Sequence, residues 1–216
     1  MQKKKRYSSG LRLWHWLSAI AIAGSLLTVL INSTVLSGGT GVSTVKSSLG
    51  SHHVIISDDQ ARSVVHDLRD NVWSWHTWIG FVLVALLLFR LIVEITQPSG
   101  QKLIKKIINA WQRYDMIRQD TISPKHEFWV KTLYALFYVL LFITAITGLD
   151  LAFEDDFKYL RKFHFLKEVH AFNMYLILLF IIVHIGGVFL AERGKTDKGI
   201  VSDMINGGEN SELLQN

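Results

Sequence analysis

The sequence of 216 residues contains no cysteine. Without thiols the chain has no disulfide, no thiolate-held iron–sulfur cluster, no cysteine nucleophile and no C-x-x-C-H site for covalent haem. Charged residues are also scarce, at 19%, below the roughly 25% of soluble domains. Any metal or prosthetic group must therefore be held by histidine, methionine, tyrosine or carboxylate side chains.

Motifs of the common soluble enzymes are missing as well. The chain has no P-loop, no G-x-G-x-x-G, no H-E-x-x-H and no Ser-His-Asp order. No segment reads as a soluble domain that houses a flavin or a molybdenum centre. The net charge of +5 is compatible with nucleic-acid binding, but basic cytoplasmic loops of a membrane protein give the same total. We expect no nucleic-acid partner.

Long apolar runs are what the sequence has in abundance, since half of its residues are apolar. Four runs are long enough to cross a bilayer core of about 30 Å, which takes about 20 helical residues. A buried soluble bundle is the alternative, but four such runs are rare in a chain this short. We therefore predict an all-α integral membrane four-helix bundle formed by residues 1–208, with 209–216 as a loose tail. The predicted spans are about 13–36, 72–96, 128–149 and 169–191.

Basic residues are unevenly distributed among the connections. The first twelve residues and the 97–127 connection are rich in Lys and Arg, whereas the 37–71 connection holds more Asp than Lys and Arg. Because Lys and Arg collect on the cytoplasmic side, we predict cytoplasmic N- and C-termini, with the 37–71 and 150–168 connections outside. The N-terminus is similar to a secretory signal peptide, but its apolar run is too long, so we expect the first helix to be retained.

The connections suggest little further structure. The glycine-rich stretch at 38–41 reads as flexible, and 100–120 as a basic interfacial helix. Residues 59–71 predict a short surface helix with one apolar face, made by Ala61, Val64, Val65 and Leu68. Most tryptophans lie near predicted helix ends, as an interfacial belt would: Trp14, Trp16, Trp73, Trp75, Trp78 and Trp129.

Four histidines lie in or just inside the predicted spans: His15, His76, His170 and His184. Ionisable side chains are rare in membrane spans and usually functional. His170 and His184 share a helix face, about 21 Å apart along the axis. In the predicted topology His15 and His184 lie toward the cytoplasm, and His76 and His170 toward the outside. The four histidines therefore form two pairs, each at one depth.

Two neutral imidazoles on opposing helices are what a non-covalent bis-histidine haem b needs. We accordingly predict two haem b groups, one held by His15 and His184 and one by His76 and His170. Arg12 and Arg90 are candidates to pair with haem propionates, although Arg90 has snorkelling as an alternative. Small residues leave room between the helices: Ala19, Ala21, Ala23, Gly24, Gly80, Gly186 and Gly187.

Other uses of these histidines are open. Zinc or copper at either level would need further ligands, and a proton relay would not require two opposed pairs. The other histidines are expected to be mostly solvated, with His126 bordering a quinone or proton path as an alternative. These are His52, His53, His66, His126 and His164.

Several short motifs are similar to those of one known family. Arg12-Leu13-Trp14-His15-Trp16 resembles the first-helix motif of the prokaryotic cytochrome b561 family, and Trp75-His76-Thr77-Trp78-Ile79-Gly80 resembles its second-helix motif. His170 and His184 resemble its paired fourth-helix ligands. The segment at 199–208 is similar to that of the branch with the b-type cytochrome subunits of nickel-iron hydrogenases. Formate dehydrogenase and thiosulfate reductase cytochromes are similar too. The resemblance covers about residues 10–208.

This resemblance implies a dihaem cytochrome of the bacterial inner membrane that exchanges electrons with membrane quinone near the inner haem. It implies His15, His76, His170 and His184 as ligands, and a periplasmic iron–sulfur subunit as the partner. We expect the electron-transfer subunit of an oxidoreductase complex, embedded in lipid, with homo-oligomerisation open. The alternatives are a stand-alone quinone-linked superoxide oxidase of the same family, and a haem-free transporter or membrane anchor.

Overall fold

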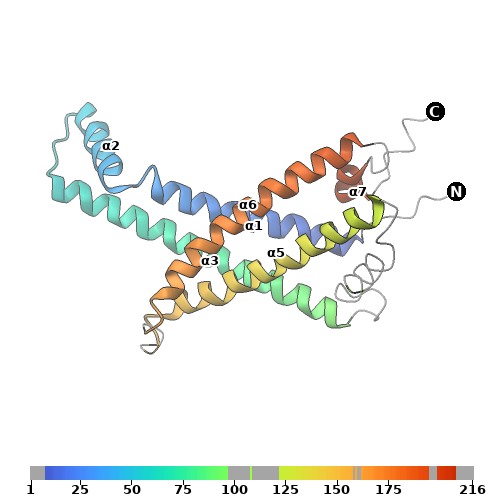
Figure 1. Cartoon of the computed structure of the whole chain (residues 1–216). Helices are drawn as coiled ribbons and strands as arrows, with labels where there is room; N and C mark the ends of the chain where they lie inside the picture. The colour runs from blue at the N-terminus through green and yellow to red at the C-terminus, as the bar shows by residue number, and fades with distance from the viewer. Residues whose placement is uncertain are drawn as a thin grey trace. The chain divides into compact units, whose positions relative to one another are not determined.

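The computed structural model describes residues 8–96, 108, 122–157, 159, 162–194 and 199–207, with only the helix backbone described over 122–131. Within these residues the secondary structure is helical and contains no strand (Figure 1). This confirms the all-α prediction. The helices are α1 (Ser9–Ser33), α2 (Gly38–Ser51), α3 (Asp58–Thr96), α5 (Ile122–Phe153), α6 (Phe165–Arg193) and α7 (Ile200–Asn206).

Four helices are long and apolar enough to cross a membrane, namely α1, α3, α6 and the 132–153 part of α5. They confirm the prediction of four helices that could span a membrane. Many of their large apolar side chains are exposed, as side chains that face lipid must be; Ile20 and Leu190 are 67% and 70% exposed. The predicted interfacial helix at 100–120 and the tail at 209–216 lie outside the described residues.

Helix α3 differs from the prediction of a surface helix followed by a separate span. It runs unbroken for 39 residues, or about 58 Å at about 1.5 Å per residue. The sequence turns apolar near residue 72, but no glycine or proline lies between Asp58 and Ile79, so nothing ends the helix there. Because a bilayer core is about 30 Å thick, the polar first part of α3 extends beyond it.

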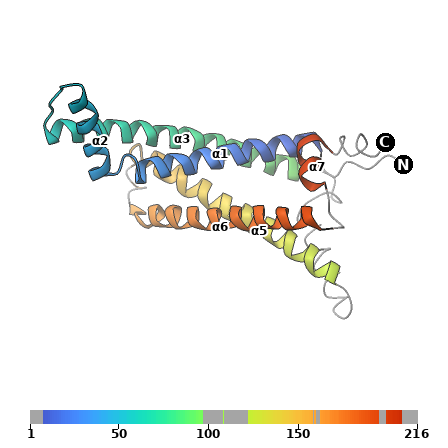
Figure 2. The same ribbon diagram turned by 90° about the horizontal axis from the view of Figure 1, so that it is seen from above.

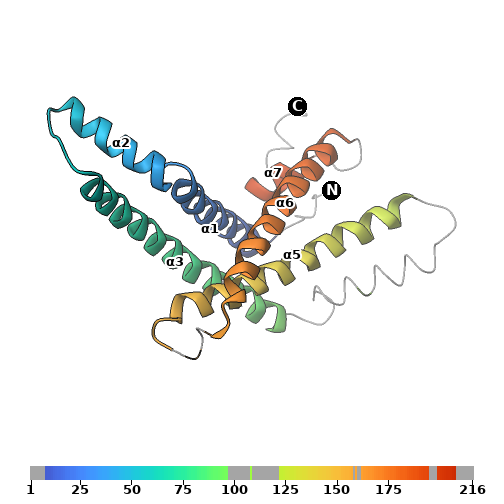
Figure 3. The same cartoon turned by 60° about the vertical axis from the view of Figure 1, so that its left-hand side comes forward.

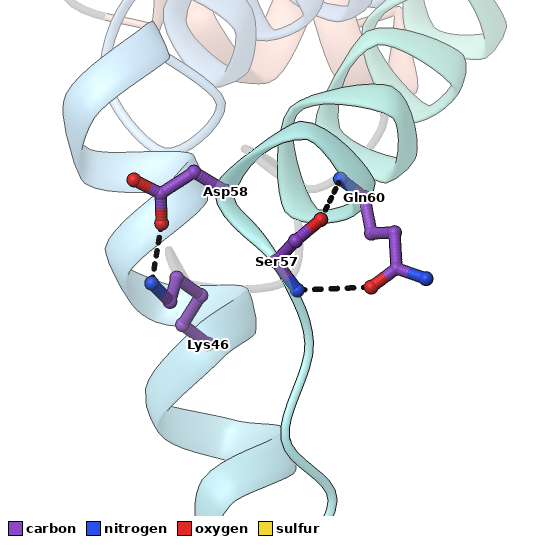
Figure 4. Close-up of polar contacts among 4 residues, drawn as sticks. All are labelled: Lys46, Ser57, Asp58 and Gln60. Carbon is purple, nitrogen blue, oxygen red and sulfur yellow. Dashed lines mark hydrogen bonds and ion pairs between the residues drawn. The ribbon is translucent and has the colours of Figure 1, made fainter.

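The start of α3 is capped and joined to α2 (Figure 4). Ser57 and Gln60 form a capping box: the Ser57 N–H donates to Gln60 Oε1 at 2.9 Å, and the Gln60 N–H donates to Ser57 Oγ at 3.2 Å. Lys46 of α2 donates a hydrogen bond to the Asp58 carboxylate. These contacts fix where the long helix begins.

The glycine-rich stretch predicted to be flexible is instead the beginning of α2. Its glycines allow close packing, because a Cβ at Gly41 would lie 2.9 Å from Val65 Cγ1. Of the apolar face predicted for 59–71, Ala61 and Val65 are buried, while Val64 and Leu68 are exposed. Only half of that face is therefore covered.

Residues 17–84 make up one of two compact units of the chain. In it α1 and α3 lie side by side (Figure 2), and a Cβ at Gly24 of α1 would lie 3.5 Å from Ile79 Cδ1 of α3. The buried Asn32 donates to the Arg69 carbonyl at 3.5 Å. An amide placed this way ties the two helices together where they leave the apolar region.

The other unit contains residues 1–16 and 85–216. In it α5 and α6 run in opposite directions and pack together. The rings of Phe137 and Phe180 are stacked, with their centroids 4.6 Å apart. The buried Asn173 donates to the Leu140 carbonyl at 2.8 Å. A satisfied amide in an apolar helix pair fixes the register of α6 against α5.

Trp14 does not belong to an interfacial belt, contrary to the sequence prediction. Its side chain is buried, its indole N–H donates to the Leu86 carbonyl at 2.9 Å, and its ring stacks on Tyr138 at 5.9 Å. The hydropathy pattern placed it near a helix end, but its neighbours there are protein groups. The side chain of Trp129 lies outside the described residues, whereas Trp16, Trp73, Trp75 and Trp78 are exposed.

The short helix α7 lies beside α6 (Figure 3) and is hydrogen-bonded by side chains at both ends. At its start, Glu192 of α6 accepts hydrogen bonds from the Gly199 and Val201 N–H groups at 3.0 and 3.5 Å. At its end, Arg12 donates to the Ile205 carbonyl at 3.1 Å and the Trp16 indole donates to the Met204 carbonyl at 3.2 Å. A carboxylate at the N-terminus and a guanidinium at the C-terminus both complement the helix dipole.

Gly207→Ala should release α7. Gly207 has φ +74°, and a Cβ there would lie 3.0 Å from Arg12 Nη1, so alanine adds about 1–2 kcal/mol of backbone strain and a steric clash. Limited proteolysis should then cut the segment after α6 faster than in the wild type. Gly39→Ala is the control, since Gly39 is helical and a Cβ there meets nothing within 4 Å. Equal cleavage of both variants would contradict this account.

Candidate functional site

His15 and His184 lie together in one unit, one near the start of α1 and the other toward the end of α6. Their ring centroids are 6.2 Å apart and their planes are inclined at 65°. Both side chains are half-buried. The structure therefore brings together two imidazoles that the sequence predicted to meet.

Aromatic rings surround this histidine pair. Phe180 stacks on His184 with centroids 5.7 Å apart, and Tyr134 approaches its edge at 6.5 Å. Trp16 lies edge-on to His15 at 5.4 Å. These aromatic rings limit the rotation of the two imidazoles and provide an apolar surface for a planar ligand.

His170, at the other end of α6, is bonded to α5. Thr147 Oγ1 lies 2.9 Å from His170 Nδ1, and the same hydroxyl donates to the Ile143 carbonyl at 2.8 Å. Gly148 gives the ring its space, because a Cβ at that position would lie 3.2 Å from His170 Cε1. The ring is thus positioned by two consecutive residues of α5.

His76 of α3 has a matching environment in the unit of residues 17–84. Thr28 Oγ1 lies 2.8 Å from His76 Nδ1, and Ser25 Oγ lies 3.3 Å from it. The Thr28 hydroxyl donates to the Ser25 carbonyl at 2.6 Å. Trp73 lies edge-on to the ring at 5.3 Å. A threonine on a neighbouring helix therefore contacts the same nitrogen in His76 and in His170.

The two arginine candidates have different surroundings. Arg90 pairs with Glu94 at 3.3 Å, donates to the Tyr138 hydroxyl at 3.1 Å and is only 14% exposed. Arg12 donates to the Ile205 carbonyl and to Ser9 Oγ. Its buried Nε has no acceptor among the described residues, so Arg12 retains one donor for a further anion.

The remaining histidines are not part of these groups. Their described side chains are exposed, and His66 pairs with Asp70 at 3.0 Å. The side chain of His126 lies outside the described residues. Within the described part of the chain, no three His, Asp or Glu side chains are arranged to share a metal ion. The exposed histidines are His52, His53, His66 and His164.

A comparison with protein families decides the class. The model described as prokaryotic cytochrome b561 matches residues 6–207. The chain belongs to the prokaryotic cytochrome b561 family. Searches among curated proteins and among solved structures give no match. As a cytochrome b561, the chain is a multi-pass membrane b-type cytochrome of electron transfer, and the family implies b-type haem.

The His15–His184 geometry fits a b-type haem. A nitrogen–metal bond is about 2 Å long, and two imidazoles on one iron therefore have centroids about 6 Å apart, close to the observed 6.2 Å. A cytochrome b561 chain without cysteine must hold its haem through such non-covalent contacts.

Sequence reasoning missed the residues that support the histidines. Thr28, Thr147 and Gly148 each lie in an apolar helix, where single small or hydroxyl residues are common. Only the positions of neighbouring helices reveal that they face an imidazole. Phe180, four residues before His184, was the one supporting residue with a readable signal, because it shares the face of its histidine.

Enlarging Gly148 should disturb the site at His170 in a graded way. Alanine brings Cβ to 3.2 Å from the ring, so the ring must shift by a few tenths of an ångström, and valine adds two further methyl groups. If His170 holds haem, we expect Gly148→Ala to shift the haem spectrum and Gly148→Val to lower the haem content of the purified protein. Absorption spectra and haem-to-protein ratios measure both. Full wild-type haem content and spectrum in the valine variant would refute the steric role.

Proposed function

We propose that this cytochrome b561 is a dihaem electron carrier between a redox partner outside the bacterial inner membrane and the membrane quinone pool. His15 and His184 would hold the inner haem, and His76 and His170 the outer one. When bound, haem would supply the one-electron redox chemistry. The chain's own residues supply the ligands, their orientation and an apolar enclosure.

The observation that carries the proposal is the meeting of His15 and His184. Imidazoles from two span helices lie at the spacing of a bis-histidine metal site and are walled by Phe180 and Tyr134. An unliganded pair of histidines at membrane depth would be costly without a function. Arg12, with an unsatisfied Nε at the same end of α1, is our candidate for a propionate partner.

The proposed pairing of His76 and His170 is supported by their positions along the helices and by the hydroxyl groups that contact their rings. His170 and His184 lie on one face of α6, about 21 Å apart, and His76 lies at the other end of its span from the cytoplasmic connection. His76 and His170 each have Nδ1 against a threonine hydroxyl, the kind of outer contact that orients metal-bound histidines.

The outside partner is supported by the first part of α3. Its polar residues, together with α2, extend beyond the apolar length of a bilayer. The positive-inside rule places this region outside. It exposes Val64 and Leu68 beside acidic residues, and it would offer a surface on which an iron–sulfur subunit could dock.

Spectroscopy of the purified full chain tests the proposal. We expect a reduced b-type spectrum, two haems per chain and reoxidation of the reduced protein by a quinone. A colourless protein would favour a transporter or anchor, and a single haem would refute the two-level arrangement. Superoxide-driven quinone reduction by the chain alone would favour the stand-alone oxidase. Copurification of an iron–sulfur protein would favour the subunit.

A further inference from the structure

Two buried threonines stand out in the span helices. Thr28 of α1 and Thr147 of α5 are only 8% and 3% exposed. Each places its hydroxyl within hydrogen-bond distance of the Nδ1 atom of a histidine on another helix, His76 and His170 respectively. The same contact thus occurs twice, with different helices, in two separate units of the chain.

The direction of these hydrogen bonds follows from the hydroxyl protons. A threonine hydroxyl has one proton to donate. The Thr28 proton goes to the Ser25 carbonyl at 2.6 Å, and the Thr147 proton goes to the Ile143 carbonyl at 2.8 Å. Toward the histidine each hydroxyl oxygen can therefore only accept. The ring nitrogen facing it must then carry a proton and donate it.

A neutral imidazole has one N–H, so a proton on Nδ1 makes Nε2 the nitrogen with the lone pair. We propose that Thr28 and Thr147 are positioning residues that hold His76 and His170 as the Nδ1–H tautomer, with Nε2 as the iron ligand. This inference rests on the proposed function, because it assumes that these two histidines ligate haem. It adds the two residues that select the ligating nitrogen and set the ring orientation.

The hydrogen bond also tunes the metal. Donation from Nδ1–H to oxygen raises the basicity of the ligating nitrogen, which favours ferric over ferrous iron. Loss of the acceptor should therefore raise the midpoint potential. His76 also has Ser25 Oγ at 3.3 Å from its Nδ1, so a second hydroxyl oxygen remains near this nitrogen when the Thr28 hydroxyl is removed.

Valine and serine substitutions separate the hydroxyl from the volume of threonine. In the haem-loaded full chain, we expect Thr147→Val to weaken the ferric preference of one haem by up to about tenfold, a rise of up to about 59 mV. Thr147→Ser should keep the wild-type potential. Thr28→Val should shift the same haem in the same direction, and Thr28→Val with Ser25→Ala should shift it more than Thr28→Val alone. Redox titration, haem content and the low-spin ferric electron paramagnetic resonance signal are measured for each variant.

Thr34→Val is the matched control, because the Thr34 hydroxyl also donates to a carbonyl four residues earlier. A shift or haem loss with valine but not with serine supports the inference. Unchanged potentials and signal in Thr147→Val, or equal changes in the valine and serine variants, overturn it. Shifts of two different haems by the Thr28 and Thr147 variants would overturn the shared site. A wild-type chain without haem would instead refute the proposed function.

Discussion

In the proposed dihaem arrangement, replacing His184 by alanine should leave one haem instead of two. His184 and His15, whose rings lie together, would provide the two imidazoles of one proposed haem site, and alanine would remove one of these ligands. The other site shares no ligand with it and should keep its spectrum and potential. Haem content by pyridine haemochrome assay and the reduced-minus-oxidised spectrum measure the loss.

The control for this variant is His52→Ala. His52 is exposed, and in the described structure it lies outside both histidine groups, so its loss should leave two haems. Phe180→Leu is a second comparison, since it removes the ring stacked on His184 and keeps the ligand. Two intact haem spectra in the His184 variant would show that the inner site is wrongly assigned.

Paired substitutions should reveal which histidines share a haem. The double variant His15→Ala/His184→Ala should retain one haem, because both changes fall on the same site. His76→Ala/His170→Ala should retain the other. His15→Ala/His76→Ala should bind none, because it takes one ligand from each site. If two histidines share a haem, their double variant should lose no more haem than either single variant. If they belong to different haem sites, the haem losses of the two single variants should add.

The same measurement applied to crossed pairs excludes other arrangements. If His15 shared a haem with His76, their double variant would keep one haem and His15→Ala/His184→Ala would lose both. Folding of each variant is checked by its helical circular dichroism and its elution as a single detergent-solubilised species. A well-folded His76→Ala/His170→Ala protein with two haems would refute the outer site.

The four spans were predictable because membrane helices are specified by apolar length, a property of local sequence. The positions of His15 and His184 followed, since a helix fixes both depth and face for every residue along it. In the structure the centroids of these two rings lie 6.2 Å apart. The Nδ1 contacts of His76 and His170 were not predictable, because they depend on which face of a neighbouring helix lies opposite.

The errors in the fold have a common physical origin. Composition changes along α3 and around α2, and each change predicted a structural boundary that the helices do not have. Helix propensity does not follow hydropathy, however: the polar residues 58–71 are compatible with a helix. The glycines at the start of α2 are likewise accommodated because Gly41 packs tightly against Val65. Trp14 was misplaced for a related reason, because sequence position does not show that its partner is the Leu86 carbonyl.

Because α3 is unbroken, the number of residues between two positions fixes the angle between their side chains about the helix axis. Each residue of an α-helix is rotated by about 100° about the helix axis from the one before it. Ala61 and Val65 pack inward near the start of α3, and His76 lies farther along the same helix. Inserting a single residue between them would swing the inward-packing side chains by about a quarter-turn relative to the imidazole. Insertions of seven or eleven residues return to within about 20° of the same angle. Length variation in this segment is therefore constrained to such steps, even though it lies outside the apolar span.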